Sequence, residues 1–262
     1  KGIIGIILSG NQATTIFEPI TDNANTVAIF KRSDRKIDYE MEQFVCDTYE
    51  SLQASKGDSN SGIKSANDGL LKTFDLAMSV TGEYSAYHGG TLPAVNAAIA
   101  NTVARVNSIF EIDFNVTLVL VPSNDNVVFL DAASDPYGDT DANYNSEVQA
   151  ALDLFPPLGI GSANYDIGHL MSGIGNNGNA GCIGCICVNG SKGSGYTTST
   201  VPEGDFFDVD YVAHEMGHQF GANHTWSFDS EGTGVQAEPA SGTTIMGYAG
   251  IAEGNNVQPA GD

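Results

Sequence analysis

The sequence predicts an α/β fold built around a mixed, mostly parallel sheet. The first observation is the order of patterns, because β-rich runs alternate with amphipathic helical patterns between residues 72 and 171, as in helices packed on a sheet. The second is size, since 262 residues with 41% hydrophobic content can bury a sizeable core. The third is that no repeat at solenoid periods is found in the sequence, so we expect a globular domain.

The first strand and helix of this fold are expected at residues 72–80 and after Thr91. Residues 72–80 alternate well enough to predict a strand. The Gly89-Gly90 pair then breaks the chain, and Thr91 can cap a helix that ends near Phe110. Apolar side chains recur there at three- and four-residue spacing, which predicts one face packed on a core: Val95, Ile99, Val103 and Val106.

The middle of the chain predicts two further strands, a second helix and a third strand. Residues 114–122 and 126–130 are β-rich runs. A helix is expected over residues 146–155, where the two prolines that follow stop it. Residues 164–171 fit another short strand, and a glycine-rich segment with a cysteine cluster then leads to the helix that carries the main chemical motif.

Two unequal domains are expected. Residues 1–70 form a smaller β-rich part, in which the apolar run at residues 2–8 is interpreted as a strand because it lacks the features of a signal peptide. The polar stretch at residues 54–70 has almost no apolar residue to bury and predicts a linker. Residues 71–262 form the larger domain.

The charge balance excludes some classes of partner. Ten Lys and Arg against 32 Asp and Glu give a formal net charge of −22, which repels nucleic acid and anionic membrane surfaces. No apolar stretch approaches the roughly 18 residues needed to span a bilayer. We therefore expect neither nucleic-acid binding nor a membrane span.

One motif carries the chemistry of the chain: His214, Glu215, His218, Gly221 and His224. It follows an apolar pattern that is typical of a helix, and on a helix residues four apart lie one turn from each other. His214 and His218 can therefore point at one metal ion. Gly221 allows a turn that ends the helix and brings His224 back toward the same ion. Three imidazoles predict a zinc site with one open coordination position.

Glu215 is expected to be the general base of that site. It lies one residue after the first ligand, so its carboxylate points away from the metal ligands and toward the position of an attacking water. A metal site that only holds a fold needs no such base. The other two histidines, His88 and His169, are expected to be stabilising or surface residues.

These residues resemble the long zinc-binding consensus of the metzincin peptidases, and residues 243–248 resemble their methionine turn. The resemblance implies that Met246 forms a hydrophobic base under the zinc ligands. It also implies that Tyr248 ligates zinc or stabilises the transition state, as in the astacin-like and serralysin-like branches. A packed tyrosine is the alternative reading of Tyr248.

Residues 71–259 are most similar to bacterial reprolysin-like (adamalysin-like) peptidases, although Thr225 stands where those proteins usually carry Asp. The resemblance implies a metzincin-type zincin fold and a secreted endopeptidase that hydrolyses peptide bonds with an activated water. It further implies that substrate pairs with an edge strand, for which residues 164–171 are the candidate. A C-terminal helix of the family would then be missing after residue 262.

The same analogy makes residues 1–70 similar to the end of a prodomain, which would act as the chain's own inhibitor. Cys46 then has three interpretations: a latency ligand of the zinc in a zymogen, a disulfide partner of the cysteine cluster, or a buried inert thiol. The cluster itself predicts either a local disulfide staple or a redox pair: Cys182, Cys185 and Cys187.

Two further alternatives stay open from the sequence. An acidic loop could bind Ca²⁺ or be simply solvated, and its members are Asp131, Asp135, Asp139 and Asp141. The whole chain could also be a non-catalytic extracellular binding module stabilised by zinc or calcium. Glu215 argues for the peptidase.

Overall fold

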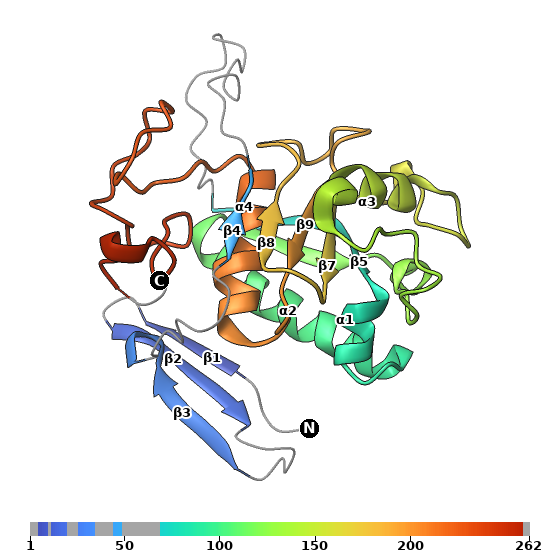
Figure 1. Ribbon diagram of the computed structural model, residues 1–262, viewed down its shortest axis with the longest axis horizontal. Helices are drawn as coiled ribbons and strands as arrows, with labels where there is room; N and C mark the ends of the chain where they lie inside the picture. Colours follow the sequence, from blue (N-terminus) through green and yellow to red (C-terminus); the bar gives the residue numbers. More distant parts are fainter. Residues whose placement is uncertain (1–4, 10–11, 20–25, 35–43, 49–68, 259–262) are drawn as a thin grey trace. The chain divides into compact units, whose positions relative to one another are not determined.

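The computed structural model describes residues 5–9, 12–19, 26–34, 44–48 and 69–258 (Figure 1). The chain divides into two compact units. One consists of Phe44–Asn223, and the other combines Lys1–Gln43 with His224–Asp262. Most of the expected linker at residues 54–70 lies outside the described residues.

A six-stranded sheet forms the centre of the unit Phe44–Asn223. Its spatial order is β4-β8-β9-β7-β5-β6. All neighbouring strands are parallel except β8 and β9, which are antiparallel. The predicted mixed, mostly parallel sheet is therefore confirmed. Its strands are β4 (Val45–Cys46), β5 (Lys72–Val80), β6 (Val116–Leu120), β7 (Ile167–Ser172), β8 (Asn177–Asn179) and β9 (Gly195–Thr198).

Helices pack on both faces of this sheet (Figure 1). On one face, Leu170 of β7 and Tyr196 of β9 share a core cluster with Leu152 of α3. On the other face, His169 of β7 contacts Gln219 of α4. The helices are α1 (Gly82–Tyr87), α2 (Leu92–Asp113), α3 (Tyr144–Asp153), the π-helical η5 (Phe206–Ala213) and α4 (His214–Gln219). Short 3-10 turns cover Asn124–Val127 (η2), Asp141–Asn143 (η3) and Ser162–Asn164 (η4).

The predicted helix after Thr91 is confirmed as α2. Thr91 occupies the N-cap position and a proline follows at the start of the helix, where its missing N–H costs nothing. The four apolar residues expected on one face are all buried. The helix runs to Asp113, slightly beyond the expected end near Phe110. The second expected helix is also present, as α3.

Two strand predictions need correction. Residues 124–127 form the 3-10 turn η2, and Val128 makes only an isolated bridge to Val80. The β-rich composition at 126–130 reflects burial of Val127 and Val128 rather than sheet pairing. The strand expected at 164–171 exists as β7, but it is hydrogen-bonded on both sides, to β5 and β9. It is an interior strand and cannot be the edge at which a substrate is added.

The second unit contains a small antiparallel sheet of order β1-β2-β3. The strands are β1 (Gly5–Ser9), β2 (Gln12–Pro19) and β3 (Val27–Lys31), followed by the 3-10 turn η1 (Arg32–Asp34). The expected β-rich character of the first residues is thus present. The C-terminal segment of this unit, from His224, is built mainly of turns, with one 3-10 turn η6 (Glu253–Asn255).

Candidate metal centre

The helix that carries the motif is anchored by buried charges on its N-terminal part. Arg105 of α2 lies 3.2 Å from an oxygen of Asp205 and 3.1 Å from an oxygen of Asp208. Thr102 donates a further hydrogen bond of 2.7 Å to Asp208. Ion pairs that lose their water need such added hydrogen bonds to be held in place. These contacts fix η5 against α2, and the sequence motif gave no sign of them.

The end of the motif helix is fixed by Gly221 and by a disulfide-closed loop. Gly221 has a φ of +108°, which only glycine adopts without strain, so the expected turn is confirmed. Cys182 and Cys185 form a disulfide, and the N–H of Gly184 inside that loop donates to the carbonyl of His218 at 2.9 Å. The cysteine cluster is therefore a local staple, as one of its two interpretations predicted.

His214 and His218 face each other on the buried side of α4. Their Nε2 atoms lie 3.1 Å apart, and both side chains are almost fully buried. The Nδ1 atom of His218 lies 2.8 Å from the carbonyl of Ala222. That carbonyl can only accept, so Nδ1 carries the proton and Nε2 keeps its lone pair for a metal.

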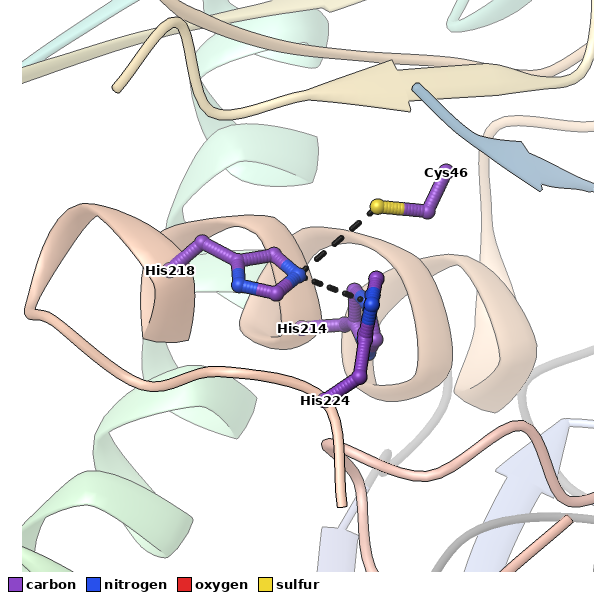
Figure 2. A group of neighbouring side chains, drawn as sticks. All are labelled: Cys46, His214, His218 and His224. Carbon is purple, nitrogen blue, oxygen red and sulfur yellow. Dashed lines mark hydrogen bonds between the residues drawn. The ribbon is translucent and has the colours of Figure 1, made fainter. Parts of the chain in front are cut away.

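Cys46 belongs to the same group of side chains. Its Sγ lies 3.7 Å from Nε2 of His218. Ligand atoms of Cys46, His214 and His218, which all belong to the unit Phe44–Asn223, lie within 4.8 Å of one another (Figure 2). Cys46 is a free thiol, and Cys182 and Cys185 bond to each other. A disulfide from Cys46 to that pair is therefore wrong.

The donor set fits zinc. In tetrahedral zinc sites, bond lengths of about 2.0–2.1 Å to nitrogen and about 2.3 Å to sulfur separate two imidazole nitrogens by about 3.3 Å. The same bond lengths separate nitrogen from sulfur by about 3.6 Å. The observed distances of 3.1 Å between His214 and His218 and 3.7 Å between His218 and Cys46 are close to these values. Imidazole and thiolate are also the donors that zinc prefers.

Glu215 is fully buried beside these ligands. Its Oε2 accepts a hydrogen bond of 2.8 Å from the hydroxyl of Thr48. Burial raises the pKa of Glu215 to about 8, while hydrogen bonds from Cys46 and Thr48 act to lower it. Gly178 of β8 leaves room for this carboxyl, because a Cβ at that position would lie 2.5 Å from Oε1 of Glu215. The strand β8 therefore lies directly against the expected general base.

The strand β4 and its flanking residues lie on the outer side of β8. The N–H of Val45 donates to Asn176 and the N–H of Asp47 donates to Gly178, at 3.1 and 2.8 Å. Phe44 and Thr48 are buried whereas Val45 is 53% exposed, as strand alternation requires. Sequence reasoning identified Cys46 but missed Thr48, although a residue two positions along a strand shares the same face.

The remaining predicted residues lie in the second unit. His224 points Nδ1 at Glu231, 3.0 Å away, which leaves Nε2 for a metal. The ring of Tyr248 packs edge-on against that of His224, with centroids 4.8 Å apart. Met246 is half-buried, and its carbonyl accepts from the N–H of Thr225. These contacts order the methionine turn, and the expected roles of Met246 and Tyr248 stay predictions.

Glu238 organises this turn and was not anticipated from the sequence. Its carboxylate accepts hydrogen bonds from Thr225, Thr243 and Thr244. Partial burial acts to raise the pKa of Glu238, but these hydrogen bonds lower it to about 2. Thr225 thus ties the residue after His224 to the methionine turn through a shared carboxylate.

The other polar candidates have structural partners. His169 is buried between Gln219 and Thr197, at 2.9 Å from each, and His88 contacts the carbonyl of Pro202. In the acidic loop, Asp135 accepts from the N–H groups of Gly82 and Tyr137. Calcium binding by that loop stays a prediction. In the described part of the chain, no helix is long and apolar enough to cross a membrane.

Comparison with models of protein families identifies the family of this chain. The family model described as Metallo-peptidase family M12B Reprolysin-like matches residues 71–261. No curated protein matches the chain. The matched residues include the sheet from β5 onward, the motif helix and the methionine turn. The chain therefore belongs to the reprolysin-like M12B family of zinc metallopeptidases.

Proposed function

We propose that this protein is a secreted endopeptidase that hydrolyses peptide bonds in proteins with Glu215 as general base. The observation that carries the proposal is that one helix holds a buried imidazole pair, His214 and His218, and the buried carboxyl of Glu215, one residue after His214. A site that only stabilised a fold would need no carboxyl at that position. The family to which the chain belongs supports the same reaction class.

His214, His218 and His224 would hold the zinc ion. When bound, the ion supplies Lewis acidity that polarises a carbonyl and lowers the pKa of water. The carboxylate of Glu215 would accept a proton from the attacking water. It would then donate that proton to the leaving amine. Burial keeps that carboxyl away from bulk solvent and favours its protonated form, which is the form that donates in the second step.

The outer edge of β8 is the proposed docking place for substrate. The antiparallel pair of β8 and β9 ends the sheet on this side when β4 is set apart. An extended peptide can add to such an edge through backbone hydrogen bonds. Because Gly178 of β8 lies against Glu215, a peptide paired there runs past the general base.

We infer further that the chain is a latent form in which residues 44–48 occupy this edge. Cys46 approaches the ligand atom of His218, and Thr48 donates to Glu215. One short strand would therefore block the metal and the general base together. Export to an oxidising compartment is supported by the disulfide between Cys182 and Cys185.

The test compares the intact chain with the chain nicked by a protease in the polar stretch at residues 54–70. Zinc content is measured on both, and casein hydrolysis is measured before and after nicking. We expect one zinc per chain and hydrolysis mainly after nicking, and we expect Glu215→Gln to reduce hydrolysis by at least about 100-fold. Full activity of Glu215→Gln would exclude the mechanism. A zinc-loaded wild type that stays inert in every nicked form would instead favour a non-catalytic module.

A further inference from the structure

The side chain of Phe44 occupies a defined site on the edge of the sheet. Its ring stacks on that of Tyr211, with centroids 3.9 Å apart and an interplanar angle of 8°. Phe44 is only 3% exposed. Resting on the proposed function, we propose that Tyr211 and Gly178 form a substrate subsite that selects a planar aromatic side chain.

The walls of this site do not belong to the segment that fills it. Tyr211 is part of η5, three residues before His214, and Gly178 is part of β8. The space exists because residue 178 has no side chain: a Cβ there would lie 2.5 Å from Cζ of Phe44. When residues 44–48 leave, the ring of Tyr211 and the bare backbone of Gly178 remain as a flat slot.

The same slot adjoins the reacting groups. A Cβ at Gly178 would lie 2.5 Å from Cζ of Phe44 and 2.5 Å from Oε1 of Glu215, so both side chains lie close to Gly178. Tyr211 and Glu215 are four residues apart, so they lie one turn from each other on the same helix face. A substrate side chain held in this slot therefore lies close to the bond that Glu215 acts on.

The chemistry of the slot defines the substrate class. A face-to-face ring pair needs a second planar ring, and Phe, Tyr and Trp supply one. Leucine can fill part of the space but cannot stack on Tyr211 over its whole face. We therefore expect peptides with an aromatic residue at one fixed position relative to the scissile bond to be the preferred substrates.

The experiment uses the full chain nicked in the polar stretch at residues 54–70. It is mixed with a peptide library, and mass spectrometry identifies the cleavage sites. Wild type should show aromatic enrichment at one position. Tyr211→Ala should remove that enrichment and lower kcat/KM for a Phe peptide by about tenfold relative to kcat/KM for the matched Ala peptide. Tyr211→Phe keeps the ring and should retain the preference.

A binding measurement separates this inference from the proposed function. A fluorescent peptide with the sequence of residues 44–48, but with Ser for Cys46 so that it carries no thiol, is titrated onto the nicked Glu215→Gln chain. Binding should weaken about tenfold when Ala replaces the peptide's Phe, or when Tyr211→Ala is introduced. Equal binding of the Phe and Ala peptides, or an unchanged aromatic preference in Tyr211→Ala, would overturn the subsite even if the chain is an active peptidase.

Discussion

At the scale of single residues, burial raises the pKa of Glu215, and the hydrogen bond from the hydroxyl of Thr48 acts to lower it. Thr48 accepts from the N–H of Ala180 and donates to Glu215, both at 2.8 Å. A hydroxyl is suited to this position because it donates and accepts at once. Valine has nearly the same shape but can neither donate nor accept a hydrogen bond. Thr48→Val therefore tests the contribution of this hydroxyl to latency.

Thr48→Val is expected to increase peptide hydrolysis by the intact, zinc-loaded chain by up to about tenfold, because the hydrogen bond that it removes contributes about 0.5–1.5 kcal/mol. The rate is followed with a fluorogenic peptide before any processing. Val45→Ala is the control, since Val45 lies on the exposed side of the same strand. Equal rates in wild type and Thr48→Val would contradict the role given to Thr48.

His169 gives the fold a dependence on pH. Burial lowers its pKa to about 4 from an ordinary value of 6.5, although the hydrogen bond with Gln219 acts the other way. The unfolded state therefore binds a proton more readily. The stability that His169 contributes as a neutral ring is present above pH 6.5 and is lost as pH falls toward 4.

Urea unfolding at a series of pH values between 7 and 4 measures this dependence. The free energy of unfolding of wild type should fall by about 3 kcal/mol more than that of His169→Gln over the range. Glutamine keeps polar contacts to its neighbours but does not titrate, so the difference in slope isolates the imidazole. Parallel pH profiles for the two proteins would rule out a neutral, buried His169.

At the scale of elements, the position of α4 is set from both of its ends. Arg105 holds η5 at the start, and the loop closed by Cys182 and Cys185 reaches the carbonyl of His218 at the end. The helix also contacts the sheet, because Gln219, the last residue of α4, contacts His169 of β7. A metal site needs ligands held in register, and these contacts provide it.

Removing the disulfide with Cys182→Ser and Cys185→Ser is expected to lower stability by about 2 kcal/mol, because the closed loop is very short. Thermal unfolding measures the change, and zinc affinity should fall with it because His218 loses its support. Cys187→Ser is the matched control, since Cys187 is an exposed free thiol in the same segment. A control variant as unstable as the double variant would show that the loop acts by something other than its cross-link.

The sheet shows why element predictions succeed unevenly. The apolar residues of α2 recur at helical spacing and are the residues that are buried, so the helix could be predicted from its sequence. The run at 126–130 is also apolar, but Val127 and Val128 are buried by packing and not by strand pairing. Likewise, β7 has the composition of a strand, and only the pairing with β5 and β9 reveals that it is interior.

At the scale of the whole molecule, the net charge of −22 makes stability depend on ionic strength. The excess carboxylates repel one another, and salt screens this repulsion over about 10 Å at 0.1 M. Raising NaCl about tenfold from a low-salt buffer should increase Tm at neutral pH. The increase should disappear at acid pH, where carboxylates are protonated. A Tm that is unchanged or falls with salt at neutral pH would contradict this view.

The sequence by itself determined the zinc motif, its helix, the turn at Gly221 and the family resemblance. These features depend on residues close together in the chain, where helical spacing alone fixes their geometry. Only the tertiary structure decided that Thr48 donates to Glu215, that Phe44 stacks on Tyr211 and that β4 pairs with β8 at the edge of the sheet. Those contacts join residues more than 130 positions apart, and no local pattern encodes such a pairing because it arises from the order of strands in the sheet.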